Sequence, residues 1–177
     1  EGGLVALAAA QDPPQALCGL ILMAAPGRPL GRIMLEQVEA NPANAPILEE
    51  MRALIEGLEA GQTRDPATVS APLQALFTEG QQRYMIDLFA QDPAALARGW
   101  DGPALIVQGD ADLQITPRDA EVLAEAMPQA RRLPLPGGTH LLKEDVAGQP
   151  FATYTDPSLP LHPALVPGIA DFLAGVE

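Results

Sequence analysis

The sequence predicts an α/β fold in which parallel strands have helices on both faces. Residues 19–25 (GLILMAA) and 104–107 (ALIV) are short apolar runs bounded by glycine or proline. This pattern is typical of strands that are buried on both sides. Leu133 and Leu135 indicate a third strand, and a helix separates it from residues 104–107. The order strand, helix, strand indicates parallel strands joined by a crossover helix.

Three helices have recognisable ends or faces. Thr116 and Pro117 suit the N-cap and first position of a helix that runs to about Met127. Residues 4–10 contain strong helix formers and few polar groups, so a helix is also expected near the start. Residues 164–174 place apolar side chains on one face, which predicts a last helix. His162 precedes that helix and is interpreted as a boundary residue.

Composition limits the kind of partner. The chain has 177 residues, enough for a hydrophobic core, with 10 basic and 23 acidic residues and a net charge of −13. Such a balance argues against nucleic acid or an anionic membrane surface as a partner. No apolar stretch approaches the roughly 20 residues of a membrane span. The single Cys18, expected to be buried in its apolar run, favours a reducing compartment, so a cytoplasmic protein is expected.

Polar side chains follow two of the predicted strands. Asp110 and Asp112 come directly after residues 104–107, within the run G-D-A-D, and His140 ends the run G-G-T-H after the third strand. Parallel strands bring these positions to the same edge of the sheet, where ligands of open α/β sheets bind. A carboxylate and an imidazole are therefore expected to meet there.

These runs resemble the acid and base segments of the α/β-hydrolase fold family. The opening residues, E-G-G-L-V-A-L, are similar to the residues directly after the nucleophile in that family's elbow, G-x-S-x-G. On that motif Gly2 is the second glycine, Gly3 belongs to the same tight turn, and the nucleophile precedes Glu1. A side chain at Gly2 is expected to crowd the turn. The resemblance implies the C-terminal portion of such a fold, with the nucleophile absent from this chain.

The resemblance also implies roles for the matched residues. His140 would be the general base, with a carboxylate on its other ring nitrogen to fix the tautomer. Asp112 matches the acid of the family's G-x-x-D pattern, whereas Asp110 is interpreted as a turn-forming side chain. The backbone N–H of Glu1 would be one oxyanion-hole donor, and the other would come from a segment that this chain lacks. The chain alone is therefore expected to be inactive.

The middle of the chain is expected to form a helical cap. On this view residues 1–27 and 101–177 make the partial hydrolase core, and residues 28–100 make the cap. Its apolar positions fall at helical spacing, which is typical of helix-on-helix packing, but some are expected to line an apolar substrate pocket. The candidates for that lining are Met34, Met51, Phe77, Met85 and Phe89.

The expected function is that of a serine esterase or acyl hydrolase acting on a small or medium apolar ester or acyl substrate. Neither a cofactor nor a metal is expected, since two histidines and one cysteine form no ligand cluster. One alternative is an enzyme of the same fold with Asp or Cys as nucleophile, similar to a dehalogenase or a dienelactone hydrolase. The other is a non-catalytic fragment that binds a partner, or forms a homodimer, through an exposed strand edge.

Overall fold

The computed structural model describes residues 1–176 and divides the chain into two compact units. The first, here called the sheet unit, combines Glu1–Gly27 with the chain from Pro93 onward. The second, the helical unit, is Arg28–Asp92. In sequence, the helical unit is thus an insertion between two parts of the sheet unit.

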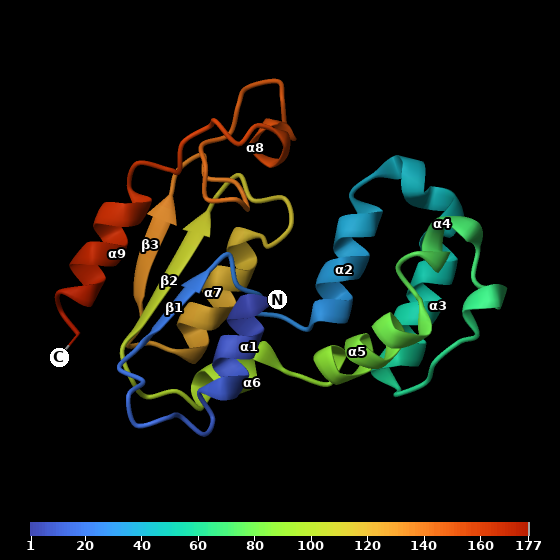
Figure 1. Ribbon diagram of the computed structural model, residues 1–177, viewed down its shortest axis with the longest axis horizontal. Helices are drawn as coiled ribbons and strands as arrows, with labels where there is room; N and C mark the ends of the chain where they lie inside the picture. Colours follow the sequence, from blue (N-terminus) through green and yellow to red (C-terminus); the bar gives the residue numbers. More distant parts are fainter. Residues whose placement is uncertain (177) are drawn as a thin grey trace. The chain divides into compact units, whose positions relative to one another are not determined.

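The sheet unit contains a three-stranded parallel sheet (Figure 1). Its strands are β1 (Leu20–Met23), β2 (Ala104–Gly109) and β3 (Arg131–Leu135), in the order β1-β2-β3. Every residue of β2 is buried, as its uninterrupted apolar start predicts for a central strand. The predicted α/β class with parallel strands is thus confirmed.

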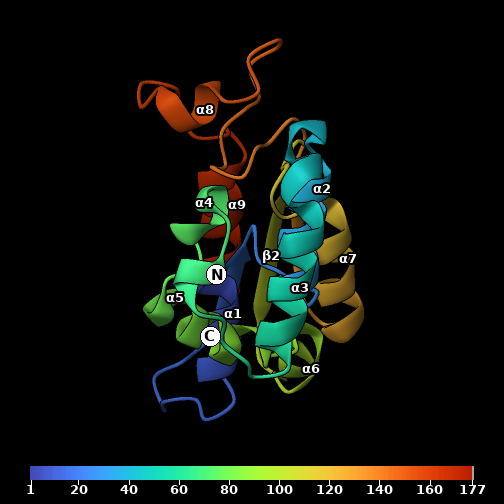
Figure 2. The same ribbon diagram turned by 90° about the vertical axis from the view of Figure 1, so that its right-hand side faces the viewer.

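Helices cover both faces of this sheet. On one face lie α1 (Gly2–Ala9), α6 (Pro93–Arg98) and α7 (Pro117–Ala126), and on the other lies α9 (Leu165–Leu173), as Figures 1 and 2 show. The short α8 (Ala152–Thr155) stands beyond the carboxyl ends of the strands. The core on the first face comprises Leu7, Ala10, Leu20, Leu22, Ala25, Ala97, Trp100, Ala104, Ile106, Ala120, Leu123 and Met127, and the core on the second comprises Leu105, Val107, Leu135, Leu165 and Phe172.

Helix α7 begins as the sequence predicts. Thr116 is its N-cap residue and Pro117 opens its first turn, where a proline removes no needed N–H. The Thr116 hydroxyl donates to Oδ2 of Asp119, at 3.2 Å, and Asp119 Oδ1 accepts from the Gly27 N–H at 3.1 Å. Asp119 thereby ties the segment that follows β1 to the start of α7.

The two compact units differ from the expected domains at one boundary. The first boundary, between Gly27 and Arg28, agrees with the two units, but the second falls at Pro93 and not at residue 101. Ala97 and Trp100 explain the difference, because both are buried in the core of the sheet unit. Helix α6 therefore belongs to the sheet unit.

Cys18 is also not where the sequence placed it. Cys18 is exposed, because it precedes β1 and lies outside the apolar run that becomes the strand.

The helical unit has its own core. Its elements are α2 (Leu30–Glu39), the 3₁₀ helix η1 (Pro42–Ile47), α3 (Leu48–Glu59), the 3₁₀ turn η2 (Pro66–Thr68), α4 (Ala71–Gln74) and α5 (Glu79–Phe89). A reciprocal capping box between Thr78 and Gln81 starts α5. The buried core comprises Leu35, Met51, Leu54, Ile55, Leu58, Val69, Leu73, Phe77 and Phe89. None of the helices formed by residues 1–176 combines the length and the apolar character of a membrane span.

Candidate active site

The connections that follow β2 and β3 are fastened to each other. A Cβ built on Gly109 would lie 2.0 Å from the Gly138 carbonyl oxygen, so only glycine allows this approach. The Ala111 N–H donates to that same oxygen at 3.0 Å. The Gly137 N–H donates to Oδ1 of Asp110 at 2.6 Å. These contacts fix the position of one connection against the other.

The connection after β2 holds Asp112 in a buried position. Asp112 is 4% exposed, and its Oδ1 accepts from the backbone N–H groups of Gln114 (2.8 Å) and Ile115 (3.0 Å). These two bonds are an Asx-type turn, a common use of a short carboxylate after a strand. They fix the orientation of the carboxylate and leave Oδ2 directed at another group.

That group is the imidazole of His140, whose Nδ1 lies 2.9 Å from Asp112 Oδ2. A carboxylate oxygen accepts hydrogen bonds, so Nδ1 carries a proton, and in the neutral ring Nε2 then keeps its lone pair. The His140 side chain is 27% exposed, whereas that of Asp112 is fully buried. The Asp112 carboxylate therefore fixes the orientation of the imidazole, and a ring held in this way can act as a base at Nε2.

The structure thus brings together the carboxylate that the G-x-x-D pattern favoured and the imidazole after the third strand. Asp110 does not contact His140 through any hydrogen bond that the structure shows, and its carboxylate instead accepts from Gly137. Its place in a turn between the two connections agrees with the interpretation made from the sequence.

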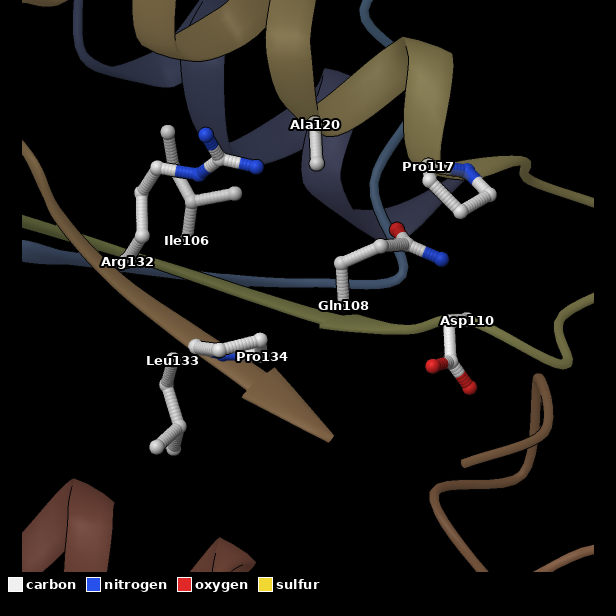
Figure 3. A pocket seen from close by; sticks show the side chains of 8 residues that line it. All are labelled: Ile106, Gln108, Asp110, Pro117, Ala120, Arg132, Leu133 and Pro134. Carbon is white, nitrogen blue, oxygen red and sulfur yellow. The ribbon is translucent and has the colours of Figure 1, made fainter. Parts of the chain in front are cut away.

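Gln108 is a neighbour of the pair that the sequence pattern did not reveal. Its Nε2 donates to the carbonyl oxygens of Ile115 (2.8 Å) and Gly109 (2.9 Å) and lies 3.4 Å from Asp112 Oδ2. The side chain rises from β2 towards Pro117 at the start of α7 and lines a cavity of about 200 Å³ (Figure 3). The sequence did contain a signal for this contact. Gln108 ends an otherwise apolar strand, and a buried amide needs hydrogen-bond partners.

The start of α1 corrects one expectation about the glycines. A Cβ on Gly2 would meet nothing within 4 Å among the described residues, so the structure shows no crowding there. The close approach is at Gly3, where a Cβ would lie 2.4 Å from Cβ of Ala25, which follows β1. Glu1 is the N-cap residue of α1, and its carbonyl oxygen accepts from the Leu4 N–H at 2.9 Å.

Three of the five expected pocket residues are core residues of the helical unit. Met51 and Phe77 are 1% and 0% exposed, and Phe89 is buried with them. Packing of helix on helix, the ordinary result of apolar positions at helical spacing, accounts for all three. Met34 and Met85 are only partly buried against the same core. No cluster of metal-ligating side chains occurs among residues 1–176.

Known proteins resemble this chain in sequence and in structure, although no protein-family model matches it. The esterase EstD of Thermotoga maritima is 29% identical over 107 residues, which are 59% of this chain and 24% of that enzyme. A solved structure from Mycobacterium tuberculosis superposes with a TM-score of 0.53 at 17% identity, over 99% of this chain and 63% of that one. A thermophilic esterase from Thermogutta terrifontis gives 0.52 at 21% identity, over 98% and 61%.

The chain is an α/β protein with parallel strands. A buried carboxylate after one strand and an imidazole after the next form a pair at one edge of the sheet. The similar solved structures are α/β-hydrolase fold proteins, and this chain has part of that fold, as the sequence predicted. The chain spans less than two thirds of the length of these relatives.

Proposed function

We propose that this chain supplies the acid and base of a serine hydrolase, an esterase or acyl hydrolase acting on a small or medium apolar substrate. The observation that carries the proposal is the contact between His140 Nδ1 and the buried Asp112 carboxylate. A neutral imidazole held in this tautomer can take a proton at Nε2, as a weak hydroxyl nucleophile requires. Likeness to two esterases supports the choice of reaction.

In the proposed reaction the nucleophile is a serine directly before Glu1 in the longer protein. Its Oγ attacks the ester carbonyl while His140 Nε2 takes its proton. The same proton passes to the leaving alkoxide as the tetrahedral intermediate collapses to an acyl-enzyme. Water then attacks the acyl carbon and gives a proton to His140, and this proton passes to the serine Oγ as the acyl–Oγ bond breaks and the carboxylic acid leaves. Asp112 stabilises the imidazolium that forms in both halves.

Negative charge on the carbonyl oxygen would be stabilised at the N-terminus of α1. The Glu1 N–H is the proposed donor, and the positive end of the helix dipole lies at the same place. Gly3 serves this geometry by letting α1 approach Ala25 more closely than a side chain would permit.

We assign the helical unit the role of a substrate-binding cap. Met34 and Met85 are the members of the expected set that stay partly exposed, so they are the ones able to contact an apolar group. Met51, Phe77 and Phe89 instead give the unit its core.

Fluorophosphonate labelling of the longer protein tests this function. The expected result is a single adduct on the residue before Glu1, with hydrolysis of p-nitrophenyl acetate and butyrate abolished by His140→Ala and retained in Ser158→Ala. Peptide mapping locates the adduct. Labelling at Ser70 or Ser158 would overturn the proposal. Ester hydrolysis without labelling would favour the alternative with an Asp or Cys nucleophile. Neither labelling nor hydrolysis would favour a non-catalytic binding fragment.

A further inference from the structure

His162 is a buried imidazole that the proposed reaction does not use. It is 6% exposed and lies in the connection between β3 and α9. Its ring and backbone make three polar contacts with other parts of that connection. Nε2 lies 3.1 Å from the Pro136 carbonyl oxygen, Nδ1 accepts from the Ala164 N–H at 3.2 Å, and the His162 N–H donates to the Leu142 carbonyl oxygen at 2.7 Å.

These contacts fix the tautomer of His162. A backbone N–H only donates, so Nδ1 has no proton and acts as the acceptor for Ala164. A backbone carbonyl only accepts, so Nε2 carries the proton and donates it to Pro136. Both ring nitrogens are therefore satisfied in the neutral form.

The two groups that His162 binds stand at the two ends of the segment that carries His140. Pro136 directly precedes Gly137, and Leu142 follows His140 by two positions. Leu142 has a φ of +57°, a conformation that an L residue rarely adopts, that costs free energy and that persists only where other contacts hold it. The bond from the His162 N–H to its carbonyl oxygen is one of the contacts that hold it.

Inside that segment, Thr139 makes the remaining bonds. Its N–H and its hydroxyl both donate to the Lys143 carbonyl oxygen, at 2.8 and 3.1 Å, and its own carbonyl oxygen accepts from the Leu142 N–H at 2.9 Å. These bonds shape the turn, but they do not join it to the start of α9. His162, which lies just before α9, joins the turn to the start of that helix through hydrogen bonds from its ring to Pro136 and from its backbone to Leu142.

We propose that His162 is a positioning residue that holds the His140 imidazole within hydrogen-bonding distance of Asp112. Of the two bonds from His162 to this segment, only the Nε2–H bond to Pro136 depends on the side chain, because the bond to Leu142 uses the backbone N–H. Without the hydrogen bond to Pro136, the Pro136 end of the segment is free to shift, and the 2.9 Å contact between His140 Nδ1 and Asp112 Oδ2 loosens. The effect on turnover rests on the proposed function, whereas the effect on the His140–Asp112 contact does not.

A matched pair of substitutions separates the two ring nitrogens. The side-chain amide of Gln places an N–H donor close to the position of Nε2, so His162→Gln retains the bond to Pro136 and loses the acceptor for Ala164. Asn places an oxygen close to the position of Nδ1, so His162→Asn does the reverse. A purely structural role for His162 would not depend on which nitrogen is replaced.

The primary measurement is the imidazole N–H proton of His140 in protein labelled with ¹⁵N-histidine. We expect the low-field Nδ1–H resonance, the signature of the bond to Asp112, to persist in His162→Gln and to broaden or vanish in His162→Asn. Equal behaviour of the two variants, or the reverse order, overturns the proposal. If His162→Asn does not fold, the unsubstituted protein still decides, because a His162 proton found on Nδ1 overturns the proposal and one found on Nε2 supports it.

Turnover gives a second readout in the longer protein. We expect His162→Asn to lower kcat about 10- to 100-fold at nearly unchanged KM, the scale of a misplaced catalytic group, and His162→Gln to recover most of the loss. If the resonances behave as expected but no variant or parent hydrolyses an ester, the proposed function fails and the positioning role stands. If esters are hydrolysed equally by both variants, the positioning role fails and the proposed function stands.

Discussion

His140 and His162 lie in the same connection after β3 and carry their ring protons on opposite nitrogens. His140 has its proton on Nδ1, facing Asp112, whereas His162 has it on Nε2, facing Pro136. The difference arises from the partners alone, since a carboxylate or carbonyl oxygen draws the N–H and a backbone N–H draws the lone pair. The first tautomer leaves Nε2 to act as a base, and the second leaves no nitrogen without a partner.

Replacing the two aspartates by asparagine should give very different losses of turnover. Asp112→Asn puts an amide against His140 Nδ1, which favours the wrong tautomer; the corresponding change in a serine protease lowers kcat about 10⁴-fold. Asp110→Asn keeps an oxygen that can accept from Gly137, so kcat should change less than about tenfold. Steady-state hydrolysis of a p-nitrophenyl ester, by the chain extended as proposed with a serine before Glu1, measures both. Similar losses in the two variants would contradict the assignment of Asp112.

Alanine at the two opening glycines should separate a crowded position from an open one. Gly3→Ala brings a Cβ within 2.4 Å of Cβ of Ala25, so the free energy of unfolding should fall by about 1–3 kcal/mol. Gly2→Ala meets nothing within 4 Å among the described residues and should change it by no more than about 0.5 kcal/mol. Urea unfolding followed by circular dichroism compares them, and a greater loss at Gly2 would argue against this packing of α1.

Removing the amide of Gln108 should destabilise the protein. In Gln108→Leu the carbonyl oxygens of Ile115 and Gly109 lose their side-chain donor in a buried place, a loss worth about 1–3 kcal/mol. The same substitution also removes a polar group 3.4 Å from Asp112 Oδ2. Thermal unfolding gives the stability change, and the His140 Nδ1–H resonance reports whether the pair is disturbed. A variant as stable as the parent would show that water replaces the amide at no cost.

Lowering the pH should reduce the stability of the helical unit, because Glu36 becomes protonated. The hydrogen bond from Arg32 lowers the pKa of the Glu36 carboxyl; burial partly opposes this shift, and Arg28 lowers the pKa further. A folded-state pKa below the unfolded one stabilises the protein above the unfolded value, about 4.3, and that stabilisation is lost as the pH falls through the folded value. Because the side chain is 33% exposed, the contribution should be below about 1 kcal/mol.

Glu36→Gln tests this pH dependence. At pH 7 the variant should be less stable than the parent, and the difference should shrink as the pH approaches about 3. Denaturant midpoints at several pH values measure the difference, with Glu79→Gln, from the more exposed pair with Arg83, as the control. A difference that stays constant with pH would show that the ion pairs of Glu36 contribute no net charge interaction.

Much of the fold and the identity of the paired carboxylate and imidazole followed from the sequence. Uninterrupted apolar runs marked β1 and β2, and Thr116 and Pro117 marked the start of α7, because burial on both faces and helix ends act locally on residue type. The position of Asp112 and His140 after neighbouring parallel strands then placed both at one edge. Local pattern and strand order were sufficient for these features.

The rest was decided by contacts between residues far apart in the chain. Met51 and Phe77 have the same helical spacing whether they face a pocket or a core, and only packing shows that they are buried. Trp100 belongs by sequence to the insertion until its contacts in the sheet unit are known. The sequence around His162 indicated only a helix boundary. It could not indicate the bond to Pro136, because that bond spans 26 positions of sequence. Hydrogen bonds and burial of this kind depend on where the chain returns in space, which residue type and spacing do not encode position by position.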